Sequence, residues 1–180
     1  MKSSFNDITL TEATLNDAPV IFDAIDSHRE QLRTWLPFVD KLQSWKEEED
    51  FLSSTLSIPY KERNLVFLIR KEGNYCGLIG FTVTDNVNHR TEIGYWLLPE
   101  YQGQGIMTEC VKRLCRFAVE KRKMNRIQIR CAVGNHPSNA IPQRLGFCLE
   151  GVERAGELLS SRKYTDLNIY SILRKEVRNL

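Results

Sequence analysis

Residues 97–108 read Leu97-Leu98-Pro99-Glu100-Tyr101-Gln102-Gly103-Gln104-Gly105-Ile106-Met107-Thr108, and the rest of the chain is organised around them. An apolar strand expected over residues 92–98 ends at Pro99, passes two glycines and becomes a helix. Apolar residues recur in that helix with the i, i+3, i+4 spacing of a half-buried helix: Ile106, Met107, Cys110, Val111, Leu114, Phe117 and Ala118. Glycines at such a helix start let free N–H groups converge at the positive end of the helix dipole. The stretch therefore predicts a phosphate or pyrophosphate site, although the same glycines would also suit an ordinary tight turn.

Length and composition indicate one ordinary folded domain. The chain has 180 residues, of which 42% are hydrophobic and 27% charged, and its net charge of +2 is too small to indicate nucleic-acid binding. The longest aliphatic and aromatic run is Leu65 to Ile69, far short of a membrane span, and no apolar signal-peptide region follows Met1. We therefore expect a single domain over residues 1–180, located in the cytoplasm, without a nucleic-acid or membrane partner.

The cysteines are an odd set of five without a C-x-x-C pair: Cys76, Cys110, Cys115, Cys131 and Cys148. This spacing argues against both a disulfide framework and a zinc site. We expect all five to be small buried side chains and expect no metal.

Sequence patterns predict elements in the order β-α-α-β-β-β-α-β-α-β-β. Alternating or continuous apolar runs indicate strands over 8–11, 65–70, 75–84, 90–98, 127–133, 147–158 and 162–172. Capping residues and helical spacing indicate helices over 15–27, 44–58, 106–120 and 138–145. The charged run from Lys46 to Asp50 is expected to be a solvated first helical turn. This order predicts an α/β (α+β) fold, a mixed, mostly antiparallel twisted sheet with helices on both faces.

A second polar cluster follows the strand at 127–133 and opens a helix. Asn135 and Ser138 would place an amide and a hydroxyl at the end of that strand, beside the glycine loop if the two strands are parallel neighbours. Helix capping alone would also explain both residues.

Both clusters resemble motifs of the GNAT acetyltransferase superfamily. Gln102-x-x-Gly105 resembles the Q/R-x-x-G-x-G/A pattern, with Met107 in the last place, and Asn135-x-x-Ser138 with Gly146-Phe147 resembles the N-x-x-S…G-F motif. Further segments resemble the Rim-type (RimJ/RimL-like) ribosomal-protein N-acetyltransferases: Glu92-Ile93-Gly94-Tyr95-Trp96, Gly146-Phe147-x-Leu149-Glu150-Gly151, Ala155-Gly156-Glu157 and Tyr164-x-Asp166-x-Asn168-x-Tyr170. The predicted element order matches the GNAT fold as well, so the resemblance covers nearly the whole chain.

The resemblance implies a GNAT-like domain with a splayed central strand and with acetyl-CoA as co-substrate. In that family the backbone of the glycine loop binds the pyrophosphate, which here implicates Gln102, Gly103, Gln104, Gly105, Ile106, Met107 and Thr108. Asn135 and Ser138 match residues that contact the pantetheine arm and the sulfur. Ser138 matches a serine proposed to protonate the leaving thiolate, and Glu157 matches a glutamate proposed to orient a water that acts as base. The tyrosine that many GNAT enzymes use as acid is replaced by Pro142, and a homodimer is consistent with the Rim-type resemblance.

The chemistry of the acceptor supports a protein N-terminus. An α-amine has a pKa of about 7.7 to 8.0 and a lysine of about 10.4, so a modest base suffices for the former. Glu157 acting through a water is one candidate base and Glu92 is a second. We expect direct attack of the amine on the thioester, with a backbone N–H at Leu97 or Leu98 stabilising the oxyanion. The thiolate resembles cysteine, with a pKa of about 8.5, so an acid would help without being essential.

Several interpretations stay open at the level of sequence. The acceptor could instead be a small amine such as a polyamine, an amino sugar or a drug, and a non-catalytic acetyl-CoA-binding regulator is a further alternative. Three aromatic residues, Trp35, Phe38 and Trp45, would line a substrate cleft or, more commonly, lie in the core. The alternating residues of the last strand would line the acceptor groove or face solvent. His136 is a weak candidate base, and His28 and His89 are expected at the surface.

Overall fold

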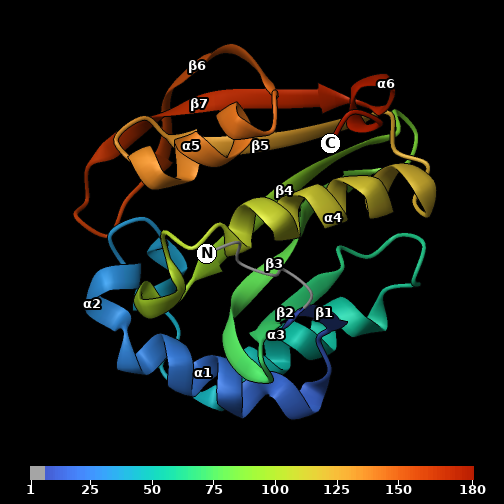
Figure 1. The fold of residues 1–180 in the computed structure, drawn as a ribbon. Coiled ribbons are helices and arrows are strands. Elements are labelled where there is room, and N and C mark those ends of the chain that lie inside the picture. Colours follow the sequence, from blue (N-terminus) through green and yellow to red (C-terminus); the bar gives the residue numbers. More distant parts are fainter. Residues whose placement is uncertain (1–6) are drawn as a thin grey trace.

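The computed structural model describes residues 7–180 and places one seven-stranded sheet at the centre of the molecule (Figure 1). The strands are β1 (Ile8–Glu12), β2 (Val66–Lys71), β3 (Asn74–Asp85), β4 (Arg90–Leu97), β5 (Arg126–Ala132), β6 (Cys148–Leu158) and β7 (Tyr164–Leu173). They follow the spatial order β1-β2-β3-β4-β5-β7-β6. Every neighbouring pair is antiparallel except β4 and β5, which are parallel. The predicted mixed, mostly antiparallel sheet is confirmed.

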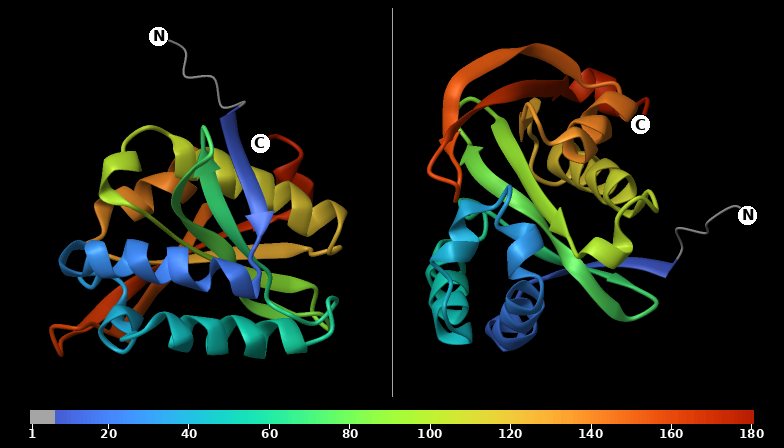
Figure 2. Two further views of the ribbon diagram at one scale, coloured as in Figure 1. Left: turned by 90° about the horizontal axis from the view of Figure 1, so that it is seen from below. Right: turned by 90° about the vertical axis from the view of Figure 1, so that its left-hand side faces the viewer.

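Helices cover both faces of this sheet, as predicted. They are α1 (Ala18–Ser27), α2 (Arg29–Leu32), α3 (Trp45–Ser57), α4 (Ile106–Glu120), α5 (His136–Arg144) and α6 (Arg174–Val177). Figure 2 shows α1 and α3 side by side on one face, with α4 and α5 on the other. The sequence patterns did not indicate α2 or α6, because a helix of four residues is too short to display a 3.6-residue period.

Two hydrophobic cores result, one on each face. The larger core joins the inner side of α4 to the sheet, and the predicted apolar stripe of α4 lies in it, with Phe117 packed against its edge. The smaller core joins α1 and α3 to the opposite face. Four of the five cysteines are buried as expected, but Cys148 is exposed because the edge strand β6 turns most of its residues to solvent. All five are free thiols.

The sheet splits between β4 and β5, and this split positions the site. The two strands pair only from Arg90 to Glu92 with Arg126 to Gln128. Beyond that point β4 stays paired with β3 as far as Leu97, while β5 stays paired with β7. The splayed central strand implied by the family resemblance is therefore present. The glycine loop before α4 follows the end of β4, and the start of α5 follows the end of β5.

No helix within residues 7–180 combines the length and the apolar character that crossing a membrane requires. In the same part of the chain, no three side chains among histidine, cysteine, aspartate and glutamate are arranged to hold a metal ion.

Candidate active site

The glycine loop has the backbone geometry that an anion site requires. Gly103 and Gly105 adopt left-handed φ values of +72° and +78°, and α4 begins directly after Gly105. No side chain caps that helix start, so the first N–H groups, those of Ile106, Met107 and Thr108, have no intrahelical partner. The Met107 side chain is 5% exposed and packs in the core. Its bulk is therefore buried, and the free amides at the start of α4 have the arrangement of an anion site.

Side chains around the loop hold its shape. Gln102 donates from Nε2 to the carbonyl oxygen of Leu97 at 3.0 Å, and Gln104 donates to that of Glu100 at 2.7 Å. Lys71 Nζ in turn donates to Gln104 Oε1 at 2.7 Å. The two glutamines thus brace the loop internally, and backbone groups remain available for a ligand.

Of the two backbone amides proposed for the oxyanion, only that of Leu97 faces the split. The Leu98 N–H donates to the carbonyl oxygen of Cys76 at 2.8 Å, which is a bond to β3. Hydrogen-bonded and non-hydrogen-bonded pairs alternate along an antiparallel ladder. Leu97, which lies opposite Gly77, therefore directs its N–H away from β3, toward the side from which β5 has diverged. The expectation for Leu98 as an oxyanion donor is wrong because the sheet already uses its N–H.

Ser138 joins the two sides of the split. Its Oγ donates to Tyr95 Oη on β4 at 3.3 Å, and that hydroxyl lies 3.2 Å from the Ser138 carbonyl oxygen, to which it donates. The Sγ of Cys131 lies 3.2 Å from the same Oγ. Asn135 caps α5, because its Oδ1 accepts the Ser138 N–H at 3.2 Å. Burial raises the pKa of Tyr95, so its hydroxyl stays protonated at neutral pH.

A cavity of about 850 Å³ opens beside this serine. Its walls come from the helices α1, α3 and α5, from strands β2 to β6 and from the segment between α2 and α3. Trp35 and Phe38 line it, so the less common interpretation of these two aromatic residues is the right one. Trp45 is 46% exposed and belongs neither to the core nor to the lining. The charged side chains that line the cavity are Lys41, Glu47, Glu48, Arg130 and Glu157.

The two candidate bases sit in different surroundings. Glu92 accepts hydrogen bonds from Thr82 (3.0 Å), Gln128 (3.1 Å) and Arg130 (2.9 Å), and it does not line the cavity. Three donors occupy the lone pairs that a base would need, so we assign Glu92 the role of holding Arg130. Glu157 lines the cavity with no such set of donors.

Glu157 owes its position to a bulge in β6. Between Glu153 and Glu157 the strand carries extra residues relative to β7, and the Asp166 carboxylate accepts the N–H of Ala155 there at 2.8 Å. Burial raises the pKa of Glu157 and the charge of Glu92 adds to this effect, while Arg130 opposes it. A carboxylate with a raised pKa is a better proton acceptor near neutral pH.

The alternating residues of β7 neither line the acceptor groove nor form a uniform solvent face. The buried Asn139 of α5 accepts hydrogen bonds from Asn168 Nδ2 at 2.7 Å and from Tyr170 Oη at 3.0 Å. Tyr170 is 1% exposed, whereas Tyr164 is 69% exposed. Most of these side chains therefore support α5 and the β6 bulge from behind the site.

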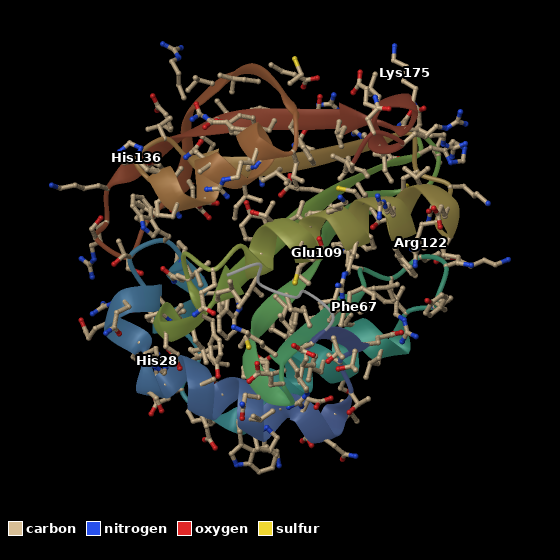
Figure 3. All side chains as sticks on the ribbon, in the orientation of Figure 1. His28, Phe67, Glu109, Arg122, His136 and Lys175 are labelled. Atoms are coloured by element: carbon tan, nitrogen blue, oxygen red, sulfur yellow. The ribbon has the colours of Figure 1, made fainter. Side chains whose placement is uncertain are left out.

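Three residues of the site were not singled out by the sequence. The sequence indicates Tyr95 only as part of a strand motif and Cys131 only as a buried thiol, yet both contact Ser138. Glu48, expected on a solvated turn, is 6% exposed. The helical spacing could have indicated this burial, because Glu48 lies four residues before Leu52 and therefore on the same face of α3. His136 is exposed and does not line the cavity; Figure 3 labels it at the start of α5 and His28 on the opposite side of the sheet.

Known proteins are similar to this chain in sequence and in fold. Residues 7–148 match the acetyltransferase (GNAT) domain. The chain is 33% identical over 170 residues to the putative ribosomal N-acetyltransferase YdaF of Bacillus subtilis, covering 94% of this chain and 92% of that protein. It is 29% identical over 156 residues to the ribosomal-protein-serine acetyltransferase of Escherichia coli, covering 87% of each. The spermidine N(1)-acetyltransferase of Escherichia coli is more distant, at 23% identity over 127 residues, covering 71% of this chain and 66% of that protein.

A solved structure shares the whole architecture. The ribosomal L7/L12 alpha-N-protein acetyltransferase RimL in complex with coenzyme A aligns with a TM-score of 0.88 at 26% identity, covering 93% of this chain and 94% of that one. The split sheet, the glycine loop at the start of α4 and the match to the domain family agree with one another. The chain belongs to the GNAT acetyltransferase family and is an acetyl-CoA-dependent N-acetyltransferase.

Proposed function

We propose that this enzyme acetylates the N-terminal α-amine of a protein, such as a ribosomal protein. The observation that carries the proposal is the similarity to ribosomal-protein acetyltransferases along nearly the whole chain. The similarity to YdaF covers 94% of the chain and so includes strand β6, which supplies Glu157. A cavity of about 850 Å³ bounded by aromatic side chains is large enough for the first residues of a peptide.

We assign the acceptance of the amine proton to Glu157. Acetyl-CoA supplies the acetyl thioester, the amine nitrogen bonds to its carbonyl carbon, and the carbon–sulfur bond breaks. Glu157 takes the proton of the amine through a water, and its raised pKa suits it to this task. An α-amine needs only this modest help, because about a tenth of it is already neutral at pH 7.

Two further groups of the chain stabilise the negative charge that develops on the carbonyl oxygen and on the sulfur during the reaction. The Leu97 N–H faces the split and would donate to the carbonyl oxygen. Ser138 Oγ would donate to the departing sulfur, with the protonated Tyr95 hydroxyl holding the serine in place. Glu92 positions Arg130 beside Glu157 and does not act as the base.

A small amine such as a polyamine is the alternative acceptor, because the cavity carries more carboxylates than cations and one distant relative is a spermidine acetyltransferase. The test is release of free CoA from acetyl-CoA with the N-terminal peptide of the ribosomal stalk protein, the same peptide already acetylated, and spermidine. We expect release with the free peptide alone. Release with spermidine and not with the peptide would overturn the ribosomal assignment and leave the acetyl transfer intact.

A homodimer stays a prediction from the family resemblance, and a cytoplasmic location stays a prediction from the sequence composition. Light scattering of the purified protein would measure the oligomeric state directly.

A further inference from the structure

Glu48 on α3 is a buried carboxylate without a partner. It is 6% exposed, and no hydrogen bond or ion pair joins it to any residue within 7–180. Its neighbour Asp50 on the same helix is exposed. Burying an unpaired carboxylate is costly, and buried charges in folded proteins are normally paired. The folded chain thus buries a carboxyl group that has no charged or hydrogen-bonding partner among residues 7–180.

The carboxylate faces the same cavity as Ser138 and Glu157. Two cationic side chains line that cavity, and neither lies within ion-pair distance of Glu48. Arg130 is engaged by Glu92 at 2.9 Å and by Glu153 at 3.3 Å, and Lys41 is an exposed residue. The remaining acidic residues of the lining, Glu47 and Glu157, only add negative charge.

The part of the sheet that lies against α3 also provides no partner for Glu48. Tyr75 of β3 lies close enough that burial and, after it, the charge of Glu48 raise the pKa of the tyrosine. The Tyr75 hydroxyl itself is buried with no hydrogen-bond partner. The charged residues near Tyr75, Arg70 and Asp17, lie 3.7 Å apart and pair with each other. The Tyr75 hydroxyl is therefore unsatisfied as well and makes no hydrogen bond to Glu48.

The position of Glu48 in α3 explains why an acidic residue occurs there but not why it is buried. It is the fourth residue of the helix, where the dipole favours an acid. An acid can interact with the helix dipole without being buried. The exposed Glu47 already does so at the start of α3, where its carboxylate also accepts the Gln43 N–H. Burial raises the pKa of Glu48 to about 7, so a positive partner arriving near neutral pH would meet it at least partly ionised.

We propose that Glu48 is the counter-ion that binds the acceptor amine in its ammonium form inside the cavity. The inference rests on the proposed use of this cavity by the acceptor. The ligand class is a primary ammonium, and aromatic walls at Trp35 and Phe38 complete a pocket suited to a cation. Acetylation turns the ammonium into a neutral amide, so the product loses this contact and the pocket favours substrate over product.

The test measures binding without turnover. CoA has no acetyl group, so a peptide with a free N-terminus forms a dead-end complex with the CoA-bound enzyme. Calorimetry at pH 7 compares that peptide with an analogue in which hydrogen replaces the α-amine, and spermidine is titrated in parallel. We expect the wild type to bind the amine peptide at least tenfold more tightly than the neutral analogue. In Glu48→Gln this preference should fall below threefold, with unchanged affinity for CoA.

Asp50→Asn is the matched control, because it removes one negative charge from the same helix at an exposed position. It should keep the wild-type preference. A Glu48→Gln protein that binds CoA normally and still prefers the amine peptide tenfold would overturn the proposal, as would a wild type that shows no preference for either amine. Acetylation of spermidine but not of the peptide would contradict the proposed protein acceptor. In that case, a loss of spermidine affinity in Glu48→Gln would still support Glu48 as the counter-ion of the acceptor amine.

Discussion

At the scale of single residues, the carboxyl group proposed to bind the acceptor amine, Glu48, should also affect the free energy of unfolding. Its pKa is raised to about 7 in the folded protein and is about 4.3 in an unfolded chain. A raised pKa contributes stability at low pH that is lost as pH rises through the folded value. The wild type should therefore lose about 2 kcal/mol of unfolding free energy between pH 5 and pH 8 through this group.

Glu48→Gln should remove that loss. We expect the stability of the variant relative to the wild type to improve by about 2 kcal/mol from pH 5 to pH 8, because glutamine does not ionise. Urea unfolding at a series of pH values measures this difference, and comparison across pH cancels the cost of the glutamine itself. A difference that does not change with pH would show that the carboxylate is not held in a costly environment.

Ser138 and Tyr95 form a second residue-scale pair. Ser138→Ala should lower kcat by about tenfold or more, because a hydrogen bond to a charged group is worth roughly 1.5 to 3 kcal/mol. Tyr95→Phe should have a smaller effect, since Tyr95 acts by holding the serine. The loss in Ser138→Ala should persist from pH 6.5 to pH 9.5, because the serine donates a hydrogen bond to the thiolate and does not have to protonate it. Steady-state kinetics over this pH range would check this, and an unchanged kcat with a raised KM for acetyl-CoA would argue against a role at the sulfur.

At the scale of elements, the start of α4 carries the cofactor prediction. Gly105→Glu should abolish detectable acetyl-CoA binding, because it puts bulk and negative charge at a left-handed position where the pyrophosphate should lie. Calorimetry measures the affinity, and circular dichroism checks that the variant is folded. Undiminished affinity in a folded variant would show that the loop is not the pyrophosphate site.

Helix α5 depends on one buried amide. Asn139 Nδ2 donates to the carbonyl oxygens of Ala132 and Asn135, both at 2.8 Å, and its Oδ1 accepts from two side chains of β7. Asn139→Ala would leave several buried groups unpaired, at roughly 1 to 3 kcal/mol for each group that water cannot reach. We expect a loss of about 3 kcal/mol in unfolding free energy. Denaturant unfolding tests this, and a loss below 1 kcal/mol would mean that α5 is held by its apolar contacts alone.

At the scale of the whole molecule, the split makes the sheet two halves joined by three residue pairs. A ligand that contacts the α4 start on one side and Ser138 on the other would connect them. Acetyl-CoA at 100 times its Kd should add about 2.7 kcal/mol of stability. Hydrogen exchange should slow most in the open part of β4, from 93 to 97. The Gly105→Glu protein is the control, and uniform slowing without a maximum there would argue against a bridging role.

The sequence alone determined the elements and the glycine loop. Strand alternation, the apolar stripe of α4, the cap at Ser44 and the two left-handed glycines are set by residues close together in the chain. Local pattern therefore predicted nearly all boundaries to within two residues, and motif spacing led to the family. The short helices α2 and α6 were missed for the same reason, since four residues hold too little pattern.

Only the tertiary structure decided which polar groups are free to act. Tyr95 meets Ser138 across 43 residues, Glu92 is occupied by three donors, and the Leu98 N–H is used by β3. Whether each of these groups is paired depends on which strand, distant in sequence, lies next to it. A shift of strand register by one residue would change the pairing. The burial of Glu48 is of the same kind, because whether a helix face meets solvent or a cavity is settled by the packing of α3 against the sheet. Local sequence sets the conformation of each segment, whereas hydrogen-bond occupancy and burial are properties of the assembled fold.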